Sequence, residues 1–235
     1  MTFINLLRKI IEMNLKISEC VFEKVPSLCV GVLVLEDVNN KADMGAFFDS
    51  EYAKIEAEKV AKFDGVELAE YPLIRAWRDI YKGFGEKKAR SSIEALIRRV
   101  VGGKGLYRIS ALVDIYNLAS LRFELPCGGE DLDTMPSVLE LTVANGTEKF
   151  LSLGATEYES PNTGEIIYKS GDIVVCRNFN YRESDITKLT ENTKRAIVVF
   201  EDVTGGDLEG AMEWFVKHVT EMTGARVVRR GVLSK

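Results

Sequence analysis

Hydrophobic and polar positions divide the chain into two halves with different periods. In the first half, residues 15–25 alternate between apolar and polar side chains, as a half-buried strand does. Residues 28–38 form a denser run of valine and leucine that predicts a buried strand. Apolar residues then recur at helical spacing in four segments. We therefore expect helices over residues 49–63, 72–83, 93–101 and 110–125.

Several of these helices carry local signals at their ends. Ser91 and Glu94 have the spacing of a capping box, and two glycines at 102–103 are a good helix stop. Pro126 closes the last helix of this half. In the first helix, a broad inner face is predicted from Tyr52, Ile55, Ala57, Val60 and Phe63.

The second half reads as short strands followed by one helix. The strand-like segments are separated by Asn-Gly, Ser-Pro-Asn-Thr-Gly and Ser-Gly turns, and they cover residues 138–144, 149–154, 165–180 and 195–203. An amphipathic helix is expected over 207–222 and a last strand over 225–233. Strands, helices, strands and a helix in this order indicate an α+β fold. We predict one domain over 14–235, preceded by a helical appendage at 1–13.

Charge and cysteine content narrow the function classes. The net charge is −5 and the pI about 5.2, so nucleic-acid binding would need a local basic patch. One cluster offers such a patch or, alternatively, a solvated helix face: Lys87, Lys88, Arg90, Arg98, Arg99, Lys104 and Arg108. Four dispersed cysteines and a single histidine argue against a zinc site and favour free thiols in a reducing cytoplasm.

Cofactors and membranes are not expected. The glycines of residues 100–105 end a helix, so they lack the strand–loop–helix context of a nucleotide-binding loop. The glycine-rich residues 203–210 precede a helix, where Thr204 to Asp207 could seat an anion or, alternatively, Asp207 is only the N-cap. No segment approaches the roughly 20 apolar residues that span a bilayer. The sequence therefore predicts no cofactor, no metal and no membrane partner.

Residues 126–133 form the most unusual segment, which we expect to be a turn. Cys127 is a nucleophile candidate that would need His218 as its base, or it is a buried structural thiol. Glu130, Asp131 and Asp133 could divide acid and base roles or bind Mg²⁺, or they form a solvated turn. All of these alternatives stay open.

A second polar segment follows the apolar strand that ends at Cys176. Arg177, Asn178, Asn180 and Arg182 appear there together, which is a reasonable place for a binding site. Arg177 could hold a carboxylate or phosphate with two parallel hydrogen bonds, or it pairs with a nearby acid of the chain.

Four motifs carry a resemblance to a known family. They are Trp77-Arg78, Ser92 with Glu94-Ala95-Leu96, Val113-Asp114 with Tyr116-Asn117 and Ser120, and Pro126 with Gly128 and Asp131. In combination they resemble the B3/B4 domain of the phenylalanyl-tRNA synthetase β subunit, and most of all its stand-alone relatives, over residues 14–230. The resemblance implies an α+β fold, a B3/B4-like β-sandwich of unusual topology flanked by helices.

The resemblance also implies a function class. In the synthetase this domain hydrolyses tRNA that carries tyrosine in place of phenylalanine. The histidine of its motif falls on Gly128 here, so that histidine is missing. Glu183 loosely matches the glutamate that selects the tyrosine hydroxyl, but the spacing differs and the preceding glycines are lost.

These observations give one site hypothesis and three functions. The predicted pocket lies between the 126–133 turn, whose glycines let a ligand approach the backbone, and the strand end at 177–183. Its predicted binding residues are Arg78, Asn117, Ser120, Gly128, Gly129, Asp131, Arg177, Asn180 and Glu183. For Arg78, Asn117 and Ser120, a buried polar network that fixes two helices is an equal alternative.

The three functions are hydrolysis of mis-acylated aminoacyl-tRNA in trans, tRNA or RNA binding without catalysis, and binding of a free amino acid or similar metabolite. As an enzyme the chain would be an aminoacyl-tRNA deacylase, with water as nucleophile and backbone N–H groups stabilising the oxyanion.

Overall fold

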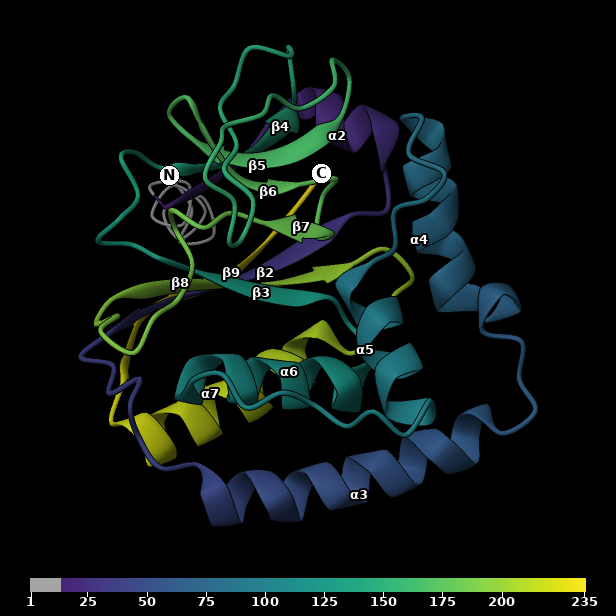
Figure 1. The fold of residues 1–235 in the computed structure, drawn as a ribbon, viewed down its shortest axis with the longest axis vertical. Helices are drawn as coiled ribbons and strands as arrows, with labels where there is room; N and C mark the ends of the chain where they lie inside the picture. The colour runs from purple at the N-terminus through teal and green to yellow at the C-terminus, as the bar shows by residue number, and fades with distance from the viewer. Residues whose placement is uncertain (1–13) are drawn as a thin grey trace.

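The computed structural model describes residues 14–235 as two β-sheets packed face to face, with helices along one side (Figure 1). The predicted appendage at residues 1–13 lies outside the described residues. The described strands are β1 (Leu15–Ile17), β2 (Cys29–Glu36), β3 (Cys127–Asp131), β4 (Leu139–Val143), β5 (Ile166–Ser170), β6 (Ile173–Arg177), β7 (Arg182–Glu183), β8 (Ala196–Asp202) and β9 (Arg226–Ser234).

The helices fall mainly in the middle of the chain. They are α2 (Glu19–Lys24), α3 (Gly45–Phe63), α4 (Pro72–Gly83), α5 (Ser92–Val101), α6 (Ala111–Phe123) and α7 (Leu208–Thr223), with a short 3₁₀ turn at Leu68–Glu70. Two predicted caps are present: the Ser91 hydroxyl accepts from the Glu94 N–H at 3.3 Å, and the Asp207 carboxylate accepts from the Gly210 N–H at 2.9 Å. Within residues 14–235, no helix has the length and hydropathy needed to cross a membrane.

The two sheets differ in strand direction and cover. The first sheet has the order β1-β4-β5-β6-β7, in which only the β1–β4 pair is parallel. The second has the order β3-β8-β2-β9 and is antiparallel throughout. Helices α6 and α7 cover the face of the second sheet that points away from the first (Figure 1). This arrangement confirms the predicted α+β class.

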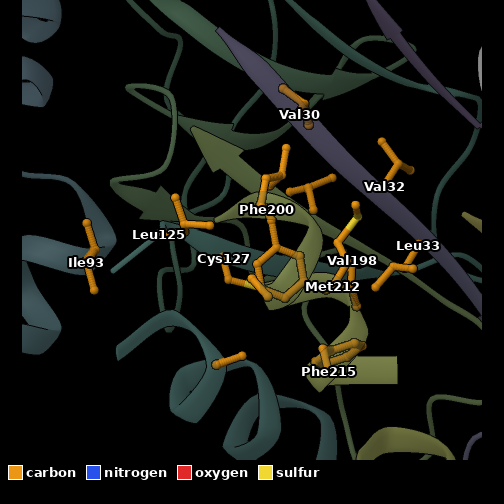
Figure 2. Close-up of a cluster of buried hydrophobic side chains, with 14 of the residues drawn as sticks. Val30, Val32, Leu33, Ile93, Leu125, Cys127, Val198, Phe200, Met212 and Phe215 are labelled. Carbon is orange, nitrogen blue, oxygen red and sulfur yellow. The ribbon is translucent and has the colours of Figure 1, made fainter. Parts of the chain in front are cut away.

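The core between the second sheet and α7 explains why one strand face is apolar. Figure 2 shows Phe200 of β8 and Cys127 of β3 beside Met212 and Phe215 of α7. The rings of Phe200 and Phe215 meet edge to face, with their centroids 5.7 Å apart. Because strand side chains alternate, the neighbouring positions of β3 and β8 face the first sheet instead.

Some predicted elements differ in the structure. Residues 15–25 form the short strand β1 and then helix α2, because Val21 and Phe22 are buried as neighbours on one helix face. Residues 149–154 make isolated bridges instead of a strand. In α3 the aliphatic Val60 is exposed, and the amine of buried Lys59 contacts Glu124 at 2.7 Å. The ion pair allows Lys59 to lie on the buried side of α3, where the sequence pattern predicts Val60.

The largest correction concerns residues 126–133. Cys127–Asp131 form strand β3 at the edge of the second sheet, paired with β8, and a turn follows only at residues 132–134. The Glu201 N–H donates to the Pro126 carbonyl at 3.0 Å. The pairing register then directs the Gly128 N–H toward β8, inside the ladder.

Candidate functional site

A cavity of about 400 Å³ lies where β3 and β8 of the second sheet meet β5, β6 and β7 of the first, with α5 and α6 contributing to its wall. Its lining is Arg90, Ser92, Ala95, Leu96, Arg99, Tyr116, Asn117, Cys127, Gly128, Gly129, Glu130, Leu139, Leu153, Tyr168, Cys176, Phe179, Asn180, Tyr181, Glu183, Ile197, Val199 and Glu201. This volume suits a small-molecule ligand or one residue of a larger ligand.

The alternation of two paired strands places glutamates in an otherwise apolar space. Gly128 pairs with Val199 and Glu130 with Ile197, so all four positions face the same side of the sheet. Glu201 lies two residues beyond Val199 and shares that side. Two acids are thus held between the sheets by the strand register alone.

The two glycines of β3 have different surroundings. A side chain added at Gly128 would meet no atom within 4 Å, so this position faces open space in the cavity wall. A Cβ at Gly129 would lie 3.2 Å from the Ile197 carbonyl oxygen and from side-chain atoms of Leu189 and Val198. The missing side chain at Gly128 therefore enlarges the cavity, whereas the one at Gly129 permits close packing.

Glu130 and Glu183 form a carboxyl pair in this cavity. Burial, followed by the charge of Glu183, raises the pKa of Glu130 well above its ordinary value. Burial also raises the pKa of Glu183 to about 7, although a hydrogen bond with Glu130 opposes the shift. Glu130 Oε2 and Glu183 Oε1 are buried without a hydrogen-bond partner among the described residues. The pair therefore holds a proton at neutral pH and offers unused acceptors.

Glu201 is fixed by a separate network. Its carboxylate accepts from the Tyr168 hydroxyl at 2.6 Å and from the Asn180 amide. The Asn180 carbonyl oxygen in turn accepts from the Tyr81 hydroxyl at 2.8 Å and from the Ser92 N–H at 3.1 Å. Burial raises the pKa of Glu201 to about 7, against the lowering effect of Tyr168 and Asn180. This network joins α4, α5 and both sheets behind the cavity.

The thiols near the cavity are poor nucleophiles. Burial raises the pKa of Cys127 well above its ordinary value, and the Glu201 charge raises it further. Burial does the same for Cys176, with Glu183 adding to the effect. His218, the partner that Cys127 would require, stacks on Trp214 and Phe47, and its Nδ1 lies 2.7 Å from the Trp214 carbonyl oxygen. Both thiols therefore stay protonated at neutral pH.

A basic groove adjoins the cavity. It is lined by Arg78, Lys82, Lys87, Lys88, Ala89, Arg90 and Tyr181, and Arg90 and Tyr181 also line the cavity. Arg78 is neutralised by Glu94, and Lys82 lies 2.9 Å from Asp79. Lys87 and Lys88 are exposed and form no ion pair with a described residue. The groove thus presents net positive charge and an exposed aromatic ring next to an acidic cavity.

Comparison with protein families matches the B3/4 domain over residues 76–206, which is more than half of the chain. The chain belongs to the B3/4 domain family. Every residue that lines the cavity falls inside the matched B3/4 region. The family resemblance carried by the sequence motifs is thereby confirmed.

Other comparisons add less. No curated protein matches the chain. Among solved structures, an N-terminal fragment of the phenylalanyl-tRNA synthetase β subunit from Pyrococcus horikoshii is 13% identical, with a TM-score of 0.49. That alignment covers 91% of this chain and 50% of the fragment, so the B3/4 chain spans about half of the fragment's length.

The structure brings five of the predicted site residues together and leaves four outside. Asn117, Gly128, Gly129, Asn180 and Glu183 line the cavity of this B3/4 domain. Their predicted roles in binding remain predictions. The other four are Arg78, Ser120, Asp131 and Arg177, and each is engaged elsewhere in the fold.

Arg78 and Arg177 neutralise buried acids. Arg78 donates to both carboxylate oxygens of Glu94, at 3.0 and 2.6 Å, and so does not reach an acid of β3. Arg177 binds Glu165 in the same two-pronged way, at 3.0 and 2.7 Å, and also donates to Glu159 at 2.8 Å. Of the two alternatives for Arg177, an ion pair within the chain is the one observed.

Ser120 and Asp131 hold β3 in place at its two ends. The Ser120 hydroxyl donates to the Leu125 carbonyl at 2.5 Å, at the entry to β3. The Asp131 carboxylate accepts from the Thr193 hydroxyl at 2.6 Å and from the Asp133 N–H at 2.9 Å. Both therefore orient the segment from its flanks, without lining the cavity.

Sequence reasoning missed several cavity residues, of which Glu201, Tyr116 and Tyr168 are the main ones. One signal for Glu201 was available: it follows Ile197 and Val199 at a spacing of two, so an acid shares a face with buried aliphatic residues. Glu130 was considered with Asp131 and Asp133 for acid–base roles, Mg²⁺ binding or a solvated turn, but it was not among the predicted binding residues. Tyr116 belongs to a family motif but has no distinguishing pattern of its own.

Proposed function

We propose that this chain binds the aminoacylated 3′ end of a tRNA and hydrolyses the ester of a mis-acylated amino acid. The observation that supports this proposal is the position of an acidic, largely apolar cavity beside a basic groove, with Arg90 and Tyr181 shared by both. The cavity would hold the amino acid. The groove would hold the terminal phosphates, and Tyr181 would stack on a base.

Glu183 is the proposed general base. A carboxylate with a pKa of about 7 can accept a proton from water and is still about half ionised at neutral pH. Water oxygen attacks the ester carbonyl carbon while Glu183 takes its proton. The bond from that carbon to the ribose oxygen then breaks, and the ribose oxygen receives the proton from Glu183. Asn117, which lines the cavity, is the proposed donor to the developing oxyanion.

A deacylation assay tests this function with a panel of aminoacyl-tRNAs that covers the common amino acids. We expect hydrolysis of at least one, and Glu183→Gln is expected to lower kcat roughly 10²–10⁴-fold. Reversing charge at Lys87 and Lys88 should raise KM and weaken its dependence on salt, with kcat little changed. Lys54→Glu on α3 is the matched control, because Lys54 is exposed but lies outside both cavity and groove. Absence of turnover on every tRNA would end the proposal.

A second candidate is a pocket for a free amino acid or similar metabolite, without catalysis. It is favoured by strand β3, because the register draws the Gly128 N–H into the ladder, where it cannot serve as one of the backbone N–H groups that would stabilise an oxyanion. A thermal-shift screen with the free amino acids tests this candidate. A ligand at 100 times its Kd adds about 2.7 kcal/mol to the free energy of unfolding.

A further inference from the structure

The carboxyl pair of Glu130 and Glu183 indicates what kind of group the cavity receives. Glu130 is 6% exposed and faces the space left open at Gly128. One oxygen of each carboxyl is buried and lacks a hydrogen-bond partner among the described residues. Buried acceptors without partners are rare in folded proteins because each costs free energy. A ligand that brings several donors would remove that cost.

We propose that Glu130 and Glu183 form a binding site for a primary ammonium group, which enters the cavity and donates to the free oxygens of the two carboxyls. This proposal rests on the proposed function in one respect, that the cavity receives the acyl part of the substrate. The ammonium could come from the α-amine of the aminoacyl group or from an amine at the end of its side chain.

An ammonium fits this pair better than other donors do. It carries three N–H donors and one positive charge, so it can satisfy both free oxygens and replace the shared proton. A hydroxyl has one donor and no charge, and would leave the proton in place. Among residues 14–235, no set of three or more acids, cysteines and histidines has the arrangement of a metal site.

Other titratable groups face the pair from each neighbouring element. Burial raises the pKa values of Tyr116 on α6, Tyr168 on β5 and Cys176 on β6, so these three stay neutral at pH 7. The Asp131 carboxylate accepts a hydrogen bond from the Thr193 hydroxyl. Glu201 on β8 is the other acid with a pKa of about 7, and it is occupied by Tyr168 and Asn180.

The two arginines that line the cavity contact other groups. The guanidinium of Arg99 lies 3.7 Å from the centre of the Tyr107 ring and donates to the Lys104 carbonyl. Arg90 lies 3.7 Å from Glu94. In the described part of the chain, neither forms an ion pair with Glu130 or Glu183. The pair therefore has acceptors and potential negative charge, but its counter-ion must come from outside.

Two isomers of acetylated lysine amide separate the sources of the ammonium. Nα-acetyl-lysine amide keeps only the side-chain ammonium, Nε-acetyl-lysine amide keeps only the α-ammonium, and the diacetylated amide has neither. Isothermal titration calorimetry of the whole chain at several pH values, in buffers of different ionisation enthalpy, gives both the affinity and the protons released. We expect one isomer to bind, with close to one proton released near neutral pH, and the diacetylated amide not to bind.

The pH dependence has a defined sign. Below the pKa of the proton that the pair holds, the affinity should rise roughly tenfold per pH unit, because the ammonium competes with that proton. Above it, a side-chain ammonium keeps its affinity to about pH 10, whereas an α-ammonium loses it near pH 8. Glu183→Gln should abolish the pH dependence and most of the affinity. Glu221→Gln, at an exposed position of α7 outside the cavity, is the control and should retain both.

Each outcome decides the proposal. Binding of all three amides alike, affinity that does not vary with pH, or no binding at millimolar concentration overturns it. Glutamine is isosteric with glutamate and relieves the buried acid pair, so Glu183→Gln is expected to fold, as thermal unfolding would verify. Proton-linked binding without deacylation would support the ammonium site and reject the proposed hydrolysis. Deacylation without proton-linked binding would support the proposed hydrolysis and reject the ammonium site.

Discussion

Buried glutamates occur in two contrasting settings in this molecule. Glu94 and Glu165 are 0% and 1% exposed, and Glu130 and Glu201 are 6% and 1% exposed, so burial does not distinguish them. Arginines bind the first two directly: Arg78 and Arg98 hold Glu94, and Arg177 holds Glu165. Glu130, Glu183 and Glu201 have no ion pair with any described residue.

The difference appears in the protonation of each group. Burial alone would raise the pKa of Glu94, but the hydrogen bonds from Arg78 and Arg98 outweigh it, and the pKa is lowered. No described cation forms an ion pair with the cavity acids to oppose burial, and the pKa values of Glu183 and Glu201 rise to about 7. A buried acid that is paired with an arginine has its charge balanced within the fold. A buried acid without one is a candidate for a ligand or for proton transfer.

The largest effect is expected from removing an arginine of the paired group. Arg177→Met leaves Glu165 as an uncompensated buried charge and should lower the free energy of unfolding by about 3–5 kcal/mol. Urea denaturation near neutral pH measures this change. Arg182→Met is the matched control, because Arg182 shares Glu159 with Arg177 but is more exposed, and it should cost less than about 1 kcal/mol. Equal losses in the two variants would remove the basis of the contrast.

The pH dependence of stability should separate the two groups of acids. The folded-state pKa values of Glu183 and Glu201, about 7, exceed the ordinary value of 4.5. The folded state therefore binds more protons between these values, and stability falls as the pH rises through this range. Glu201 contributes a loss of about 3 kcal/mol, and Glu183 contributes less because part of it reaches solvent.

The paired acids act in the opposite direction. The pKa values of Glu94 and Glu124 are lowered, so their contribution is present above about pH 4.5 and is lost as the pH falls further. Stability should therefore be greatest near about pH 5. Urea denaturation across a pH series measures the profile, and Glu201→Gln should flatten only its upper side. A profile that rises toward pH 8 would show that the cavity acids ionise freely in the folded state.

Much of the fold could be predicted because its signals are local. Helical spacing with Ser91 and Asp207 as caps located two helices correctly, and the dense aliphatic run at Cys29–Glu36 located a strand. These features depend on neighbours within one or two turns of chain. The family motifs also lay in contiguous segments, so the class of domain could be proposed before the structure.

The cavity could be predicted only in part because long-range pairing forms it. Two glycines followed by acids have the composition of a turn, and only the ladder with β8 makes them a strand. That same register turns Glu130 inward beside Glu183, which is 53 positions away in the sequence. Arg78 and Arg177 were predicted in the site because the sequence does not show which acid each of them meets.

The smallest effect is expected at the cavity wall, where adjacent glycines give opposite results. Gly129→Ala should cost about 1–3 kcal/mol, because its Cβ would crowd the Ile197 carbonyl, Leu189 and Val198. Gly128→Ala should leave stability unchanged or raise it by up to about 1 kcal/mol, because its Cβ enters open space at a backbone angle that L-residues adopt. Urea denaturation compares the two variants directly.

A larger side chain at Gly128 tests whether the open space beside it receives the ligand. Gly128→Leu should fold, since the cavity can hold the added atoms, yet it should displace any ligand that contacts Glu130. Calorimetry with the two acetyl-lysine amides measures that loss. If Gly128→Leu binds as well as the unmodified chain, the ligand does not occupy the space beside Glu130, and the unpaired acids serve proton storage or packing instead of recognition.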